Sequence, residues 1–147
     1  MAYTNAISTY RETRVKTASQ GQLIIMLYDE ALKNLDRALE LLALNAGSKK
    51  NPGNIELISK SILKTQEIIT ELTVSLDFDE GGDIAKNLFS LYTWFNKELL
   101  ESNIQQNTRR ITAVRNQIYE LRNAWAEIAV KIGSETSKTV TGVNIAG

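Results

Sequence analysis

The chain alternates between long stretches with helical periodicity and short polar breaks. In four stretches apolar residues recur three and four positions apart, as on one face of an α-helix. The breaks are GSKKNPGN (47–54), DFDEGGD (77–83) and SNIQQN (102–107), which are rich in turn-forming and polar residues. We therefore expect helices from about Gln20 to Asn45, from about Asn54 to Leu76, from near Asp83 to the turn at 102–107, and from after Asn107 to about Ile132.

Four amphipathic helices joined by short connections predict an all-α fold, an antiparallel up-down four-helix bundle. We expect a short N-terminal segment (1–18), a bundle (19–132) and a flexible C-terminal tail (133–147). Gly133 is a natural helix end, and the tail GSETSKTVTGVNIAG has too few large apolar residues to fold alone. Asn107 and Asp83 are suitable caps for the helices that follow them.

The helices contain more apolar residues than one buried stripe requires. LIIML (23–27) places five together, and at 100° per residue Leu23 falls at the edge of the core-facing arc while Met26 falls opposite it. Flanking apolar residues at helical spacing form grooves that accept an amphipathic partner helix, and methionine suits such a surface. The predicted partner contacts are Leu23, Met26, Leu63, Val74, Phe89, Tyr119 and Val130.

A more ordinary interpretation stays open for each residue taken alone. Bundle stripes are often wide, and single apolar residues are common on protein surfaces. The N-terminal segment fits the groove hypothesis, because Ile7, Tyr10 and Val15 could cover exposed apolar surface and be displaced by a longer partner.

The composition narrows the chemistry. The chain has 17 basic and 17 acidic residues, no cysteine and no histidine. Thiol catalysis, histidine-containing triads and imidazole-bound metals are therefore excluded. When a twelve-residue calcium loop is aligned on Asp77 of DFDEGGD, Gly81 and Leu88 stand at its fifth and twelfth positions, where acidic or amide ligands are needed. We predict no catalytic residue, metal or cofactor, and a binding protein rather than an enzyme.

The balanced charge gives no reason to expect nucleic acid as a partner. The N-terminus lacks the apolar core of a signal peptide, and no apolar run approaches the ~20 residues of a membrane span. We expect a cytoplasmic protein without membrane insertion.

The sequence resembles the family of flagellar export chaperones called FliS. The resemblance rests on a tyrosine before V-x-T-A and an L-rich run into L-Y-D: Tyr10, Val15, Thr17, Ala18, Leu23, Leu27, Tyr28, Asp29 and Ala31. QEIITELTVSLD (66–77), GGDIAKNLFSLYTW (81–94) and LRNAW (121–125) follow in family order. The chain departs from the pattern at Gln20, where proline is usual, at Glu30 and at Ser102.

The resemblance implies a chaperone for flagellin that uses no ATP. It implies that the bundle binds the C-terminal segment of flagellin, prevents premature polymerisation and supports delivery to the flagellar type III export gate. It also implies that the N-terminal segment lies over part of the binding surface and moves on binding. A self-associating helical structural or adaptor protein remains the alternative, and a homodimer is compatible with the sequence.

Overall fold

The computed structural model describes the backbone of residues 20–47 and 51–146 and the side chains of residues 20–47 and 51–130. Within these ranges the chain forms α2 (Gln20–Asn45), α3 (Pro52–Val74), α4 (Phe78–Gln105) and α5 (Thr108–Ala146). The first helix has the expected bounds. The second helix is shifted by two residues toward the N-terminus at both its start and its end.

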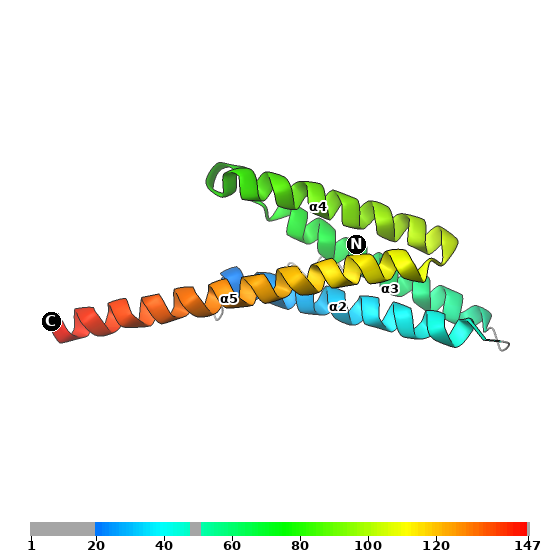
Figure 1. The fold of residues 1–147 in the computed structure, drawn as a ribbon, viewed down its shortest axis with the longest axis horizontal. Coiled ribbons are helices and arrows are strands. Elements are labelled where there is room, and N and C mark those ends of the chain that lie inside the picture. The colour runs from blue at the N-terminus through cyan, green and yellow to red at the C-terminus, as the bar shows by residue number, and fades with distance from the viewer. Residues whose placement is uncertain (1–19, 48–50, 147) are drawn as a thin grey trace.

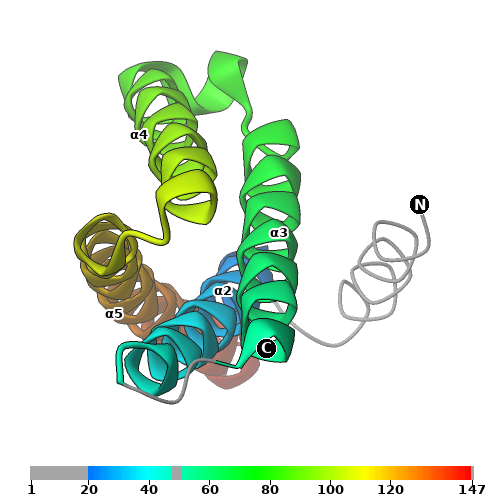
Figure 2. The ribbon, with the colours of Figure 1, turned by 90° about the vertical axis from the view of Figure 1, so that its right-hand side faces the viewer.

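The helices form the predicted antiparallel bundle, in which consecutive helices are neighbours (Figures 1 and 2). Helix α2 packs most extensively, against α3 on one side and α5 on the other. Helix α4 closes the ring by contacting α3 and α5, and it lies diagonally across from α2. Helix α4 therefore packs less extensively against α3 and α5 than α2 does.

The core lies along the bundle axis and uses the predicted three-and-four spacing. Burying one large aliphatic side chain contributes ~1.5–3 kcal/mol, so this cluster is the main source of stability. Its largest fully buried members are Tyr28, Leu35, Ile58, Ile62, Ile68, Ile69, Phe95, Leu99, Ile111, Val114 and Ile118. The three-and-four spacing of apolar residues also predicts Ile55, Ile84 and Ile128 as core positions; this prediction is wrong, because the structure leaves all three exposed.

Side-chain caps set the starts of the helices. Asn51 caps α3 by accepting from the Gly53 amide at 2.9 Å, and proline occupies the first turn. The predicted cap Asn107 is confirmed, because its Oδ1 accepts from the Arg110 amide at 3.2 Å. The predicted cap Asp83 is wrong: Asp77 caps α4 by accepting from the amides of residues 79 and 80.

Helix α4 begins earlier than predicted, and a break separates its first turn from the rest of the helix. Phe78 starts a first turn that the sequence analysis assigned to a loop. Gly82 then adopts φ 50° and ψ −126°, a conformation available essentially to glycine alone. The continuous helix runs from there, close to the predicted start.

Helix α5 is longer than predicted. Its backbone continues past Gly133 to Ala146 and extends beyond the other helices (Figure 1). The expected helix end at Gly133 is therefore wrong, since an interior glycine costs only ~1 kcal/mol relative to alanine. The flexibility of residues 133–147 stays a prediction, and the segment 1–18 lies outside the described residues.

Candidate protein-binding surface

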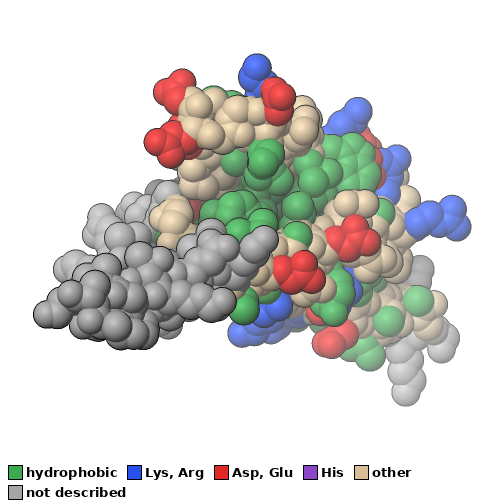
Figure 3. Space-filling model, turned by 60° about the vertical axis from the view of Figure 1, so that its left-hand side comes forward, with side chains coloured by type: hydrophobic (Ala, Val, Ile, Leu, Met, Phe, Trp, Pro, Cys, Tyr) green, Lys and Arg blue, Asp and Glu red, His purple; other side chains and the backbone are tan. Residues whose placement is uncertain are grey.

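Large apolar side chains remain exposed on all four described helices. Figure 3 shows apolar side chains gathered beneath α4, the uppermost helix in that view, with charged side chains around them. Contiguous apolar surface of this kind marks binding sites on soluble proteins, whereas scattered residues do not. The exposed residues are Leu44, Ile55, Leu57, Leu63, Val74, Phe78, Ile84, Phe89, Trp94, Leu100, Ile104, Tyr119, Ile128 and Val130.

One group follows the line where α3 meets α4. Gln66 Nε2 donates to the backbone carbonyl of Asn96 at 3.2 Å, which identifies the edges of the two helices that face each other. Helical geometry places residues three, four, seven and eight positions away on the same edge. Leu63 and Val74 therefore share the edge of Gln66, and Phe89 shares the edge of Asn96. The structure brings these three predicted contacts together.

Three further residues complete this surface. Leu100 and Ile104 lie four and eight positions after Asn96, and the Phe78 ring packs edge-on against Phe89 with centroids 5.9 Å apart. Phe78 and Ile104 were missed because the sequence analysis assigned both to turns. An apolar residue inside each polar break was the signal that could have identified them. We call Leu63, Val74, Phe78, Phe89, Leu100 and Ile104 the α3–α4 seam.

A second apolar group lies on the opposite flank of α4. Arg110 Nη1 contacts Glu98 Oε2 at 2.9 Å and joins α5 to this flank. Trp94 is one turn before Glu98, so it shares that edge, and its ring lies 5.8 Å from Phe95. Ile128 lies five turns after Arg110 on the corresponding edge of α5. Helix α4 thus has exposed apolar residues on both sides.

Two predicted contacts lie elsewhere. Arg115 Nε and Arg122 Nε bind Asp36 and Asp29 of α2 at 3.0 and 2.9 Å, which identifies the edge of α5 that faces α2. Tyr119 is one turn from both arginines, and the Arg115 guanidinium lies 5.1 Å from its ring centroid. Val130 continues this edge at eight residues after Arg122. Tyr119 and Val130 therefore lie on an edge of α5 that is flanked by ion pairs and is separate from the α3–α4 seam.

Leu23 and Met26, the other two predicted contacts, are less exposed than expected. Leu23 is only 1% exposed, so the expectation of an accessible side chain is wrong, and Leu23 serves packing. The helical wheel placed it at the edge of the core, where direction around one helix does not decide burial. Met26 is partly buried rather than directed outward. Ile7, Tyr10 and Val15, the predicted cover, lie outside the described residues.

One end of the bundle contains an apolar hollow of about 210 Å³. It lies among the start of α2, the end of α3, the start of α4 and Trp125, and its apolar walls include Ile24, Leu76 and Leu88. Gln20, the first described residue, also lines it. The described part of the chain therefore begins beside this hollow.

Two buried tyrosines lie beneath this end. Their hydroxyl oxygens, in Tyr28 and Tyr92, are 2.6 Å apart. Burial raises the pKa of both hydroxyls above the ordinary value of 10.0, and the neighbouring Tyr92 raises the pKa of Tyr28 further. Both groups therefore stay neutral, so that one donates and the other accepts. The pair joins α2 to α4 across the core.

The described residues offer little for other chemistry. Among residues 20–47 and 51–130, no three acidic side chains are grouped as metal ligands would be. Within the described part of the chain, no helix has the length and apolarity to cross a membrane.

Comparison with known proteins identifies the family of this chain. The family model described as Flagellar protein FliS matches residues 3–132. The chain is 35% identical over 127 residues to the flagellar secretion chaperone FliS of Salmonella typhimurium strain LT2, covering 86% of this chain and 89% of that protein. It is 26% identical over 127 residues to the flagellar secretion chaperone FliS of Bacillus subtilis strain 168, covering 86% and 88%. This chain therefore belongs to the FliS family of flagellar proteins.

Proposed function

We propose that this protein is a cytoplasmic flagellar secretion chaperone that holds the C-terminal segment of flagellin on apolar surface beside α4. Binding would prevent premature polymerisation and support delivery to the flagellar type III export apparatus. The observation that carries the proposal is the α3–α4 seam, since the chain belongs to a family whose compared members are named secretion chaperones.

The seam is long enough for a partner helix to lie along it. From Phe89 to Ile104 it extends along α4 for ~22 Å, which corresponds to about four helical turns. A segment that is disordered before binding loses conformational entropy on docking, so it needs a large apolar contact to bind usefully. Exposed side chains along both α3 and α4 supply that contact without any catalytic group.

The N-terminal segment has a part in this proposal. The described chain begins at Gln20, beside the apolar hollow, and in this proposal Ile7, Tyr10 and Val15 of the preceding segment cover apolar surface until flagellin displaces them. Such a cover opens at a lower free energy than the whole bundle. Deletion of residues 1–15 should leave the thermal unfolding of the bundle cooperative while raising peptide affinity or causing aggregation. Absence of both effects would contradict the cover.

The direct test is calorimetric titration of the full chain with a synthetic flagellin C-terminal peptide at several temperatures. We expect a one-to-one complex with a negative heat-capacity change, which is the signature of apolar burial. Leu63→Asp should weaken binding about tenfold or more, because it places a carboxylate in the apolar contact.

Ser90→Asp is a matched control. Ser90 is exposed on α4 one position after Phe89, so it adds the same charge on a different face. It should leave both the affinity and the unfolding temperature unchanged. Self-association without peptide binding, seen by size-exclusion chromatography, would contradict the proposal and favour a structural protein.

A further inference from the structure

The groove between α2 and α3 differs in chemistry from the apolar surface beside α4. It has a volume of about 720 Å³, and its polar lining includes Lys33, Asn34 and Arg37 of α2 with Lys60, Ser61 and Lys64 of α3. We call these six residues the α2–α3 groove. We infer that this groove binds an acidic peptide segment of a second partner protein while flagellin occupies the α3–α4 seam.

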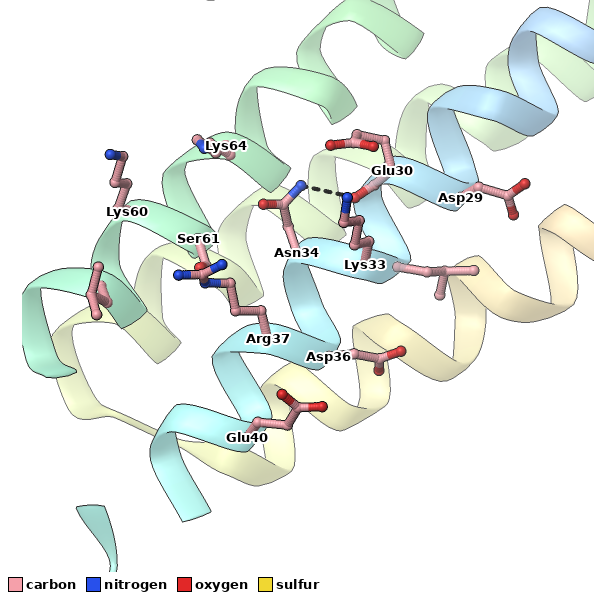
Figure 4. A pocket seen from close by; sticks show the side chains of 12 residues that line it. Asp29, Glu30, Lys33, Asn34, Asp36, Arg37, Glu40, Lys60, Ser61 and Lys64 are labelled. Carbon is pink, nitrogen blue, oxygen red and sulfur yellow. Dashed lines mark hydrogen bonds between the residues drawn. The ribbon is translucent and has the colours of Figure 1, made fainter. Parts of the chain in front are cut away.

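Ion pairs on α5 give the groove its excess of positive charge. Asp29 and Asp36 of α2 point away from α3 (Figure 4), and they bind Arg122 and Arg115 at 2.9 and 3.0 Å. Both aspartates are at the rim of the groove and are counted among its lining residues, but each is already neutralised by an arginine of α5. The arrangement separates the charges of α2 into an edge paired with α5 and an edge facing α3.

The cations of the groove are without such partners. Within residues 20–47 and 51–130, none of Lys33, Arg37, Lys60 and Lys64 forms an ion pair. Glu30 and Glu40 also line the groove, which leaves two more cations than unpaired carboxylates. Complementary charge of this kind guides the choice of partner.

The floor of the groove is polar where a helix interface is normally apolar. Asn34 and Ser61 are 8% and 4% exposed. The Asn34 amide donates to the Glu30 carbonyl at 2.8 Å, while Asn34 Oδ1 and the Ser61 hydroxyl have no hydrogen-bond partner among the described residues. Neither atom is among the buried polar atoms without partners, so both remain accessible in the groove, where a ligand can form hydrogen bonds with them.

The geometry favours an extended or helical acidic segment over a small anion. Lys60 and Lys64 are one turn apart on α3, and Lys33 and Arg37 are one turn apart on α2. Figure 4 shows Asn34 and Arg37 directed toward α3 between these rows. The two rows of cations can pair with carboxylates repeated along an acidic peptide. The backbone amides of that peptide would then lie above Asn34 and Ser61.

The experiment uses the full chain and two fluorescein-labelled peptides. Each peptide has about 12 residues, the length of the part of α2 that lines the groove. One peptide consists of glutamate and alanine, and the other replaces each glutamate with lysine. Fluorescence anisotropy compares the wild type with Lys60→Glu/Lys64→Glu and with the control Lys86→Glu/Lys97→Glu. Lys86 and Lys97 are exposed on α4, and the control changes the net charge equally.

We expect the acidic peptide to bind the wild type and the control alike, and the groove variant at least about tenfold more weakly. A third variant, Asn34→Leu/Ser61→Ala, should unfold at no lower temperature yet bind the acidic peptide more weakly. Saturation with a flagellin C-terminal peptide should leave the acidic peptide bound.

Several outcomes would overturn the inference. One is equal binding of the acidic and lysine peptides, or equal binding by the groove and control variants. Another is displacement of the acidic peptide by flagellin peptide, since the groove would then belong to the flagellin site; that result leaves the proposed chaperone function intact. An oligonucleotide of equal charge that binds the groove as tightly would show a general anion surface instead.

Discussion

Removing apolar side chains from the α3–α4 seam should weaken flagellin binding far more than it weakens the fold. The perturbation is the triple substitution Leu63→Ala, Val74→Ala and Phe89→Ala. These side chains are 51%, 72% and 47% exposed in the free protein. Much of their surface is therefore still available to a partner and contributes nothing to the bundle.

The exposed fractions set the size of the effect. Complete burial of a large apolar side chain is worth ~1.5–3 kcal/mol, and docking can bury only the part that is exposed. Truncation to alanine should therefore remove ~1 kcal/mol of binding free energy at each position. If the three effects add, the affinity falls roughly 100-fold.

The assay is titration of a labelled flagellin C-terminal peptide, followed by anisotropy, with thermal unfolding measured on the same samples by circular dichroism. The matched control is Tyr119→Ala/Val130→Ala, which truncates residues 47% and 73% exposed on the α2-facing edge of α5. We expect the control to retain most of the affinity, because its residues lie apart from the seam.

Three results would refute this reasoning. A triple variant that binds within about threefold of the wild type would exclude the seam as the main contact. An equal loss in the control would mean that the peptide depends as strongly on the α2–α5 edge. Loss of cooperative unfolding in the triple variant would show that these side chains support the core.

The remaining predictions concern the core and the α4 break. Tyr92→Phe should lower the free energy of unfolding by ~1–3 kcal/mol, since it leaves the buried Tyr28 hydroxyl unpaired, whereas Tyr28→Phe/Tyr92→Phe should recover much of this loss in urea denaturation. Because the pKa of both tyrosines is raised in the folded state, their neutral forms stabilise the fold below pH ~10; stability should fall as pH rises above this value, by up to ~1.4 kcal/mol per pH unit for each tyrosine. The doubly substituted protein should lack most of this fall, and an unchanged pH profile would contradict the assignment. Gly82→Ala should destabilise the bundle by ~1–3 kcal/mol because φ is positive there, while Gly47→Ala, whose added Cβ meets nothing within 4 Å, should have little effect in thermal unfolding.

Periodicity in the sequence was sufficient to predict the helices and their bundle. Apolar residues at three-and-four spacing must be buried along one face, and short connections make consecutive helices antiparallel neighbours. The ends were less certain, because a cap depends on local backbone geometry. Asp77 and Asp83 are both suitable cap residues, and the structure shows that Asp77 caps α4, while the positive φ at Gly82 separates the first turn from the rest of the helix.

The sequence also identified residues outside the main stripe, but it did not place them relative to one another. Leu63, Val74 and Phe89 form one seam because Gln66 of α3 faces Asn96 of α4. Tyr119 and Val130 lie apart from it because Arg115 and Arg122 turn their edge of α5 toward α2. A helical wheel describes directions around one axis and contains no information about the neighbouring axis.

Leu23 shows the same limit in the opposite sense. Its position on the wheel is only marginal to the core, yet its side chain is buried in the structure. The amino-acid sequence by itself determined which residues each helix turns inward and that apolar residues were left over. Only the tertiary structure decided which of them remain accessible, because burial depends on the atoms that other helices bring to each edge.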